Sequence, residues 1–342
     1  MLGMVFGVHG SRSKPGRLEV EGLPPQILTE YNLNPHSWEK NSSTWRITSD
    51  QGGVIIGLYD GDSGRLDTVL RWQESSASQG SAAVLRPLKT RTGKHTAVLE
   101  KSVYYALAKP DGEVFKPGHK NNLLVCAQEL GLVHHMTRDF LAEEPFFFDW
   151  PKLIQERLTD LLTYSHWLKK KRAQTDFEHL YLESLDFFYN QGQEAIQHMV
   201  LATVGGEMDH RQALLINTFL KQTLMPADEK VYFLDLTRWT KGPRMMDLAL
   251  FLNSYMPLHK WDLALLLDIM QQYQRNEGLN RREKHLLVAL LRFPSRFWLY
   301  ARQYFCGDRP PHELAEKLKN YRYECCERDK CLDLFEEQLW KE

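Results

Sequence analysis

Two polar segments near the middle of the chain hold the residue types that could do chemistry. Residues 203–212 read Thr-Val-Gly-Gly-Glu-Met-Asp-His-Arg-Gln, and Asp235 lies in a β-prone run at residues 231–236. Turns beside a short hairpin at a lobe junction are a good place to hold phosphates and metal ions. The carboxyl and carboxamide side chains of these segments are therefore the ones to consider for a site. The alternative is that they are ordinary polar loop and turn residues.

A further motif follows at residues 242–249, which read Gly-Pro-Arg-Met-Met-Asp-Leu-Ala. With the segments above, it resembles the aminoglycoside-phosphotransferase and choline-kinase type of kinase fold, in particular its bacterial spore-coat members of the CotS/YsxE type. In that family a His-Gly-Asp loop precedes an Asn, a strand ends in Asp-hydrophobic-Asp/Glu, and Gly-Pro-Arg-x-x-Asp-Leu-Ala starts a helix. The structural positions that match are Gly206, Gly242, Pro243, Arg244 and Asp247.

Two shorter segments are similar to the spore-coat branch of the same family. Residues 293–298, Phe-Pro-Ser-Arg-Phe-Trp, are similar to a helix start of that branch, and residues 27–33 look like its opening helix. The resemblance implies a two-lobed, protein-kinase-like α+β fold with a small β-rich lobe and a larger helical lobe.

The resemblance also implies phosphoryl transfer from ATP with Mg²⁺, in which the protein mainly positions groups and neutralises charge. This sequence departs from the required set. Glu207 stands at the catalytic Asp position, Gln212 at the metal-binding Asn position and Thr237 at the second carboxylate after Asp235, and the loop opens with Gly205 in place of His. Each added methylene moves a functional group by about 1 Å, and misplacement on that scale can cost ~100-fold in rate.

The phosphate-holding devices of the small lobe are missing as well. Residues 54–59 contain no lysine, and Asn-Ser-Ser at residues 41–43 stands where a glycine-rich loop would be. The favoured hypothesis is a non-catalytic spore coat protein that acts in coat assembly with other coat proteins and needs no cofactor. The rival is an ATP- and Mg-dependent small-molecule phosphotransferase with Glu207 as base and Gln212 plus Asp235 on the metal. A nucleotide-binding module without turnover lies between the two.

The Gly-Pro-Arg motif also has a purely structural interpretation. Asp247 falls in the first turn of a predicted helix, where a carboxylate is favoured by free amides and the helix dipole. We expect a structural role, with Arg244 as a candidate partner.

The predicted elements divide the chain into a β-rich lobe at 1–110, a linker at 111–122 and a helical lobe at 123–342 that contains the degenerate loops of 203–247. In the first lobe, residues 44–48 and 54–59 flank the turn 50–53 and predict a hairpin. Apolar spacing predicts a helix at 65–72 and strands at 97–99 and 103–107.

The second lobe is predicted to be helical with one β insert. Residues 213–216 and 231–236 form that insert around a turn at 226–229, and Asn121 is a candidate cap. The predicted helices are 122–137, 152–171, 176–185, 191–201, 246–254, 261–275, 281–291, 297–305 and 313–320.

Composition sets the broad class. The 342 residues are 43% hydrophobic and 25% charged, and 43 Lys plus Arg balance 44 Asp plus Glu for a net charge of −1. This balance disfavours a nucleic-acid binder. No apolar run reaches the ~20 residues of a membrane span, and the N-terminus lacks a signal-peptide pattern. We expect synthesis in the cytoplasm and, by resemblance, a place in the spore coat.

Three remaining features have structural and functional interpretations. The basic run at residues 169–172 is a solvated helix end or a contact for an acidic partner. The adjacent His134 and His135 face different directions on a helix, so packing is favoured over metal binding. Cys325, Cys326 and Cys331 are expected to be free surface thiols, with cross-linking in an assembled coat as the alternative.

Overall fold

The computed structural model describes residues 19–41, 44–80, 82–138, 149–171, 175–203, 211–235, 239–307 and 309–341. They form two compact units. One holds the described residues up to Phe115 together with Leu220–Trp239, and the other holds Lys116–Phe219 and Thr240 onward. The sequence predicts a single lobe for all of 123–342. Residues 220–239 instead join the first unit, where Val84 forms a parallel bridge with Phe233 and the Glu113 amide donates to the Pro226 carbonyl at 3.0 Å.

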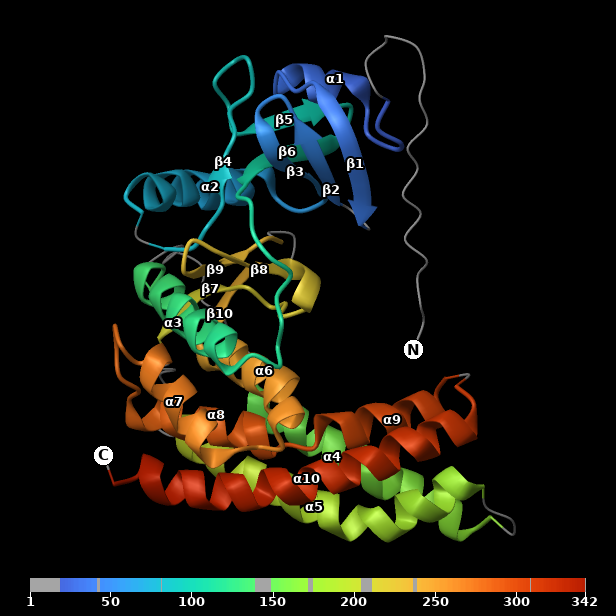
Figure 1. The fold of residues 1–342 in the computed structure, drawn as a ribbon. Helices are drawn as coiled ribbons and strands as arrows, with labels where there is room; N and C mark the ends of the chain where they lie inside the picture. Colours follow the sequence, from blue (N-terminus) through green and yellow to red (C-terminus); the bar gives the residue numbers. More distant parts are fainter. Residues whose placement is uncertain are drawn as a thin grey trace. The chain divides into compact units, whose positions relative to one another are not determined.

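An antiparallel sheet forms the centre of the first unit (Figure 1). Its strands run in the order β1-β2-β3-β6-β4, and β5 also pairs with β6. The predicted hairpin of β2 and β3 is confirmed, with Thr44 opposite Gly57 and Ser49 opposite Gly52. The strands are β1 (Pro35–Asn41), β2 (Thr44–Ser49), β3 (Gly52–Tyr59), β4 (Arg86–Pro87), β5 (Thr96–Leu99) and β6 (Ser102–Lys109).

Side chains alternate in direction along each strand, so the sheet has two different faces. One face packs with helix α1 (Pro25–Glu30) in a hydrophobic core that includes Ile27, Ile47, Ile56 and Tyr104. The residues between these positions, such as Arg46 and Ile55, belong to the other face, because successive side chains of a strand point to opposite sides.

Helix α2 (Ser63–Ser78) completes the part of the first unit that precedes β4. Asp62 caps it by accepting hydrogen bonds from the Gly64 and Arg65 amides. Its buried residues, which include Leu66, Leu70 and Gln73, recur at helical spacing, as the sequence predicts for an amphipathic helix.

The predicted β insert has a different pairing from the expected one. β8 (Leu224–Ala227) and β9 (Lys230–Phe233) form a tight hairpin, in which Asp228 and Glu229 adopt positive φ angles of 50° and 62°. That is the backbone of a two-residue hairpin turn. The expected partner of β9, β7 (Gln212–Leu215), pairs instead with β10 (Thr240–Pro243) in the second unit. A strand that needs a long-range partner carries no local signal of where that partner lies.

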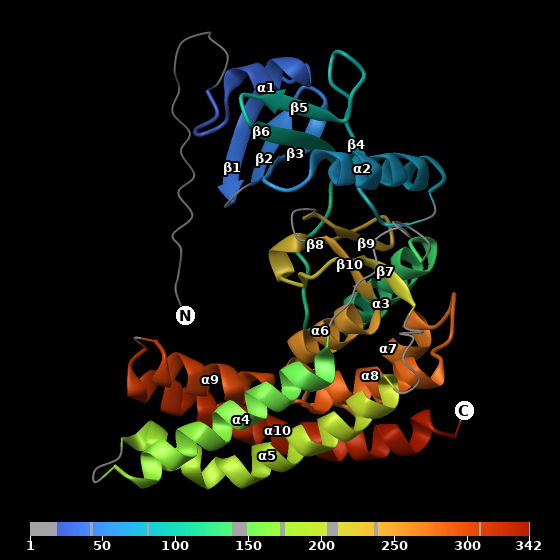
Figure 2. The same cartoon turned by 180° about the vertical axis from the view of Figure 1, so that it is seen from behind.

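Helices build most of the second unit, and Figures 1 and 2 both show α4, α5, α9 and α10 side by side. Stacked aromatic rings join them, including Tyr164–Phe305, Tyr181–Phe297 and Phe188–Tyr321. The helices are α3 (Lys120–Met136), α4 (Trp150–Lys169), α5 (Asp176–Thr203), α6 (Met245–Tyr255), α7 (Leu263–Tyr273), α8 (Arg281–Arg292), α9 (Ser295–Phe305) and α10 (Pro311–Leu339), with 3₁₀ turns at η1 (Lys221–Thr223) and η2 (Met256–His259).

Two helix predictions were wrong in detail. The expected helices 176–185 and 191–201 are one continuous helix, α5. Gly192 lies inside it because a Cβ there would come within 2.4 Å of Leu158 on α4, so this glycine serves close packing between the two helices. The N-cap of α3 is His119 and not Asn121, and no side chain caps that helix.

The cysteine prediction also needs correction. All five cysteines are free, but Cys325 and Cys331 are buried and only Cys326 of the three is exposed. The 29-residue helix α10 turns Cys325 and Cys331 toward the bundle with Leu332 and Phe335. None of the helices in the described part of the chain has the length and apolar character needed to cross a membrane.

Candidate functional site

In the first unit, β3 lacks the lysine that would grip a phosphate, and the neighbouring strand fills the space of one side chain. Gly57 lies opposite Tyr105 of β6, and a Cβ added to Gly57 would lie 2.2 Å from the Tyr105 ring carbon Cζ. Tyr105 is fully buried. A longer side chain at position 57 therefore requires the tyrosine ring to move.

One cation on the same face of the sheet as Gly57 forms a hydrogen bond within the first unit. Arg46 of β2 lies opposite Ile55, two residues from Gly57, so its side chain shares that face. Its guanidinium donates a hydrogen bond to the Gln222 carbonyl in the segment before β8. A charge that could have replaced the missing lysine thus ties the sheet to residues 220–239.

Helix α2 contains a buried polar side chain without a hydrogen bond. Gln73 is 0% exposed, and neither its Nε2 nor its Oε1 atom has a hydrogen-bond partner among the described residues. Buried polar groups in proteins are nearly always paired, because an unpaired one keeps its full desolvation cost. Among the described residues, no partner thus offsets the desolvation of this side chain.

Asp235 follows β9 directly after Leu234 and is half-buried. It belongs to the first unit, whereas Gln212 belongs to the second. Thr237 and the loop residues Gly205, Gly206 and Glu207 fall outside the described residues. The predicted convergence of Glu207, Gln212 and Asp235 thus stays a prediction.

In the second unit, Gln212 begins β7 opposite Pro243 of β10. Its Oε1 atom is buried and has no hydrogen-bond partner among the described residues. The preceding residue, Arg211, donates to the Gly278 carbonyl at 2.7 Å and pairs with Glu277 at 3.1 Å.

The Gly-Pro-Arg motif starts with a close approach between strands. Gly242 of β10 pairs with Ala213 of β7, and a Cβ on Gly242 would meet the Leu215 side chain at 2.8 Å. Pro243 closes the strand just before α6 begins. These two residues bring the entry of α6 against β7.

Arg244 is the buried anchor of the motif, with 2% of its side chain exposed. Its Nε donates to Glu283 of α8 at 2.6 Å, and its Nη1 lies 3.3 Å from Glu277. Glu283 also completes a capping box with Asn280. The Asn-x-x-Glu spacing is a sequence signal for such a box, and it would have identified Glu283 as a structural residue.

Asp247 is fully buried and holds the end of β7. Its carboxylate accepts hydrogen bonds from the backbone amides of Ile216 at 2.5 Å and Asn217 at 2.9 Å. The Nε2 atom of His134 lies 3.2 Å from the same carboxylate, and its Nδ1 atom lies 2.8 Å from the Tyr273 hydroxyl. Arg244 thus pairs with Glu283 rather than with Asp247, which had been its suggested partner.

Burial sets the protonation state of this network. Desolvation lowers the pKa of His134, although Asp247 opposes the shift, so the imidazole is held neutral. Burial also raises the pKa of the Tyr273 hydroxyl. The neutral His134 links α3, α6 and α7, as the packing hypothesis for this residue expected. His135, in contrast, is exposed and lies 3.8 Å from Glu277.

The chemistry of these donors fits a Mg²⁺ ion only in part. An orphaned carboxamide oxygen on Gln212 is a suitable ligand for a hard cation. However, no three His, Cys, Asp or Glu side chains gather closely enough to hold a metal among the residues that the structure describes. The described residues therefore do not amount to a metal site, and no reaction step can be built on one.

The architecture defines the class of protein. A crystal structure of an aminoglycoside phosphotransferase from Alicyclobacillus acidocaldarius matches with a TM-score of 0.84 and 18% identity over 96% of this chain and 99% of that one. The amicoumacin kinase hAmiN matches with a TM-score of 0.58 and 13% identity over 90% and 92% of the two chains, and spectinomycin phosphotransferase APH(9)-Ia with 0.57 and 12% over 91% and 94%. The fold is that of the kinase-like aminoglycoside phosphotransferases.

A match to a protein family is more specific than the match to the fold. Residues 25–335 match the family described as "Spore coat putative kinase YutH". The chain belongs to this family, which confirms the resemblance to spore-coat proteins inferred from the motifs. A search of curated protein sequences finds no match.

Proposed function

We propose that this protein is a non-catalytic, kinase-fold component of the spore coat that acts in coat assembly through its surfaces. One observation carries the proposal: the Tyr105 ring occupies the space that a side chain at Gly57 would need, on a strand without lysine. Arg46, a cation on the same face, donates a hydrogen bond to the Gln222 carbonyl.

The altered loop supports the same conclusion. Glu207 and Gln212 keep the functional groups of the family's Asp and Asn but lengthen both side chains, and Thr237 lacks a carboxylate. The loss of the lysine removes a charge-assisted contact to phosphate. Together with the changes at positions 207, 212 and 237, this loss disfavours efficient phosphoryl transfer. Spore coat proteins are the expected partners, by membership of the family.

The second candidate is an ATP- and Mg-dependent phosphotransferase with Glu207 as base and with Gln212 and Asp235 on the metal. Its supporting observation is the buried, unpartnered Oε1 atom of Gln212, which a cation could satisfy. The amicoumacin kinase of the comparison binds AMP-PNP and Ca²⁺, and the spectinomycin phosphotransferase binds ADP.

A thermal-shift titration separates the two candidates. A micromolar site would gain about 4 kcal/mol at 1 mM ligand, which raises the melting temperature of a chain this long by several degrees. We expect 1 mM ATP with Mg²⁺ to move it by less than about 2 °C. A larger rise that disappears in Asp235→Ala would contradict the proposal, and ATP turnover would establish the enzyme.

A second experiment tests the assembly role directly. Spores of a strain that lacks this protein are complemented with the wild type, with Asp235→Asn or with Glu207→Gln, and coat composition is compared by extraction and gel analysis. The non-catalytic proposal expects both variants to restore the wild-type coat. Failure of both stable variants would favour the phosphotransferase.

A further inference from the structure

The second unit carries an open groove where the ends of four helices meet. It lies at the C-terminal ends of α4 and α9 and the N-terminal ends of α5 and α10, with a volume of about 620 Å³. That size lies within the range of ligand-binding clefts. The lining residues include Trp167, Tyr304, Phe305, Arg309, Pro310 and Pro311.

The aromatic residues that line this groove pack against buried rings on one side and are exposed to solvent on the other. Phe305 stacks on Tyr164 with ring centroids 4.4 Å apart and also contacts the edge of Trp167. Trp167 itself is 54% exposed. An exposed indole on a packed aromatic base offers a large contact area at low entropic cost, as binding surfaces do.

The described residues that line the groove carry more positive than negative charge. Glu178 is the one carboxylate among them; it is buried, and it accepts from Lys171 Nζ at 2.8 Å, from the Thr175 amide and from the Tyr304 hydroxyl. These bonds hold the pKa of Glu178 below its usual range despite its burial. Lys171 and Glu178 therefore neutralise each other.

Three further exposed cations lie at the groove or next to it in the sequence: Arg309 lines it, and Lys169 and Lys170 stand between the lining residues Leu168 and Lys171. Lys169 and Lys170 end α4, Arg309 precedes α10, and all three are exposed. None of them forms an ion pair with another residue of the described part of the chain. Lys169 and Lys170 of the basic run thus lie next to the aromatic groove in the sequence, which favours a partner contact over a merely solvated helix end.

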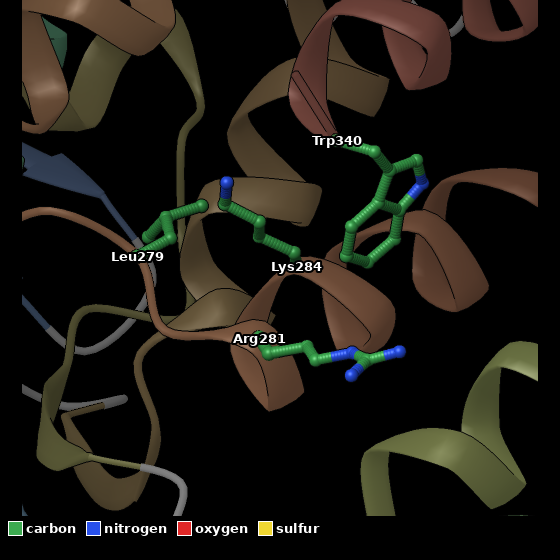
Figure 3. Close-up of a pocket in the computed structure, with 4 residues that line it drawn as sticks. All are labelled: Leu279, Arg281, Lys284 and Trp340. Atoms are coloured by element: carbon green, nitrogen blue, oxygen red, sulfur yellow. The ribbon is translucent and has the colours of Figure 1, made fainter. Parts of the chain in front are cut away.

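A second pocket with an indole and two cations lies elsewhere in the unit, but its two cations do not point to the same side. It is lined by Leu279, Arg281, Lys284 and Trp340, with a volume of about 470 Å³. Figure 3 shows the Lys284 amine on the side of Leu279, while the Arg281 guanidinium points the other way. Lys284 also donates to the Leu339 carbonyl at 2.7 Å. Its two cations do not face a common ligand.

We propose that the groove at Trp167 and Phe305 is a docking site for an acidic segment of a partner protein that carries an aromatic side chain. The aromatic side chain packs against Trp167 and Phe305, and the carboxylates of the segment face Lys169, Lys170 and Arg309. This deepens the proposed function, in which the protein acts through its surfaces, by naming the chemistry of the partner.

Selection from a random 12-residue peptide display library on the immobilised full-length protein tests the site. The proposal expects enriched peptides with a net negative charge and at least one Trp, Tyr or Phe. The best sequence is then synthesised with a fluorescent label, and its affinity is measured by polarisation. Trp167→Ala and the charge reversal Lys169→Glu/Lys170→Glu are each expected to weaken binding at least tenfold, and added salt should weaken binding to the wild type.

Matched controls come from the rival pocket. Trp340→Ala and Arg281→Glu should leave peptide affinity within twofold, and melting curves confirm that each variant is folded. The proposal is overturned if no peptide is enriched, if the enriched peptides are basic or lack aromatic residues, or if binding responds to Trp340 and not to Trp167. The assay contains no nucleotide, so its outcome is separate from that of the ATP titration.

Discussion

The entry of helix α6 and the Gly57 face of the small sheet differ in how their polar and close-packed positions are used. At the entry of α6, Arg244 is paired with Glu283 and Asp247 accepts two backbone amides. On the sheet, Tyr105 occupies the side-chain space of Gly57, and on the adjacent α2 the buried Gln73 has no hydrogen bond among the described residues.

This difference indicates what each region is for. The residues of the family motif that match, 242–249, are those on which the packing of β7, β10, α6 and α8 depends. The positions that depart from the family pattern, 207, 212 and 237, are those to which the resemblance assigns phosphoryl transfer. Our proposal of a non-catalytic role rests on this contrast.

The largest effect is expected from breaking the buried ion pair at the entry of α6. Arg244→Ala leaves the Glu283 carboxylate, whose side chain is 1% exposed, without its main partner, and should lower the free energy of unfolding by about 3–5 kcal/mol. Urea denaturation measures this loss. Arg244→Met combined with Glu283→Gln removes both charges, keeps the capping oxygen and should recover most of the stability.

An exposed pair provides the control for that prediction. Lys330 and Glu327 lie 3.2 Å apart at the surface of α10, so Lys330→Ala should change stability by less than about 1 kcal/mol. A loss below that value for Arg244→Ala would show that the entry of α6 is not the anchor described above.

A smaller loss is expected on the sheet face. Gly57→Ala places a methyl group against the Tyr105 ring and should cost about 1–3 kcal/mol through overpacking. In a Tyr105→Ala background the same change should cost clearly less. Equal costs in the two backgrounds would mean that the ring does not block position 57. Gly118→Ala, with nothing within 4 Å of its added Cβ, is the matched control.

The next prediction is a gain of stability on α2. Gln73→Met keeps the length of the side chain and removes the buried amide that lacks a hydrogen bond, so it should stabilise the protein by about 1 kcal/mol. Thermal melting measures the gain, with the exposed Gln79→Met as the control. A loss of stability of more than 1 kcal/mol would reveal a polar role for Gln73.

The pH dependence tests the neutral state of His134. Because burial lowers its folded-state pKa, the unfolded chain takes up a proton that the native state excludes as the pH falls below about 6.5. Stability from this group is thus present at neutral pH and is lost on acidification, by at most about 1.4 kcal/mol per pH unit. His134→Gln should show a shallower loss than the wild type between pH 7 and pH 5. Parallel slopes for the two proteins would contradict the assignment.

The smallest effect is expected at Gln212. Gln212→Met removes the unpartnered Oε1 atom and should change stability by less than about 1 kcal/mol in the absence of cations. Adding 5 mM Mg²⁺ should leave both proteins unchanged in melting temperature. Stabilisation of the wild type alone would show that Gln212 still binds the ion and would favour the phosphotransferase.

Motifs and periodicity were sufficient for the class of fold and for most elements. The hairpin of β2 and β3 and the helices from α6 to α9 follow from turn residues and apolar spacing, which are local properties of the chain. The same signals failed for α5, where the two helices predicted at 176–185 and 191–201 are one continuous helix. They also failed for β7, whose partner comes about 28 residues later and not from the adjacent insert.

By itself, the sequence determined the kinase-like family, the absence of a lysine in β3 and the exchanged residues at positions 207, 212 and 237. Only the tertiary structure decided which residues of the described elements meet one another. The pairing of Arg244 with Glu283, the Tyr105 ring at Gly57 and the groove beside Trp167 join residues at least 39 positions apart, from separate strands and helices. Such contacts depend on how elements pack, and packing is a property of the folded chain that no local spacing encodes.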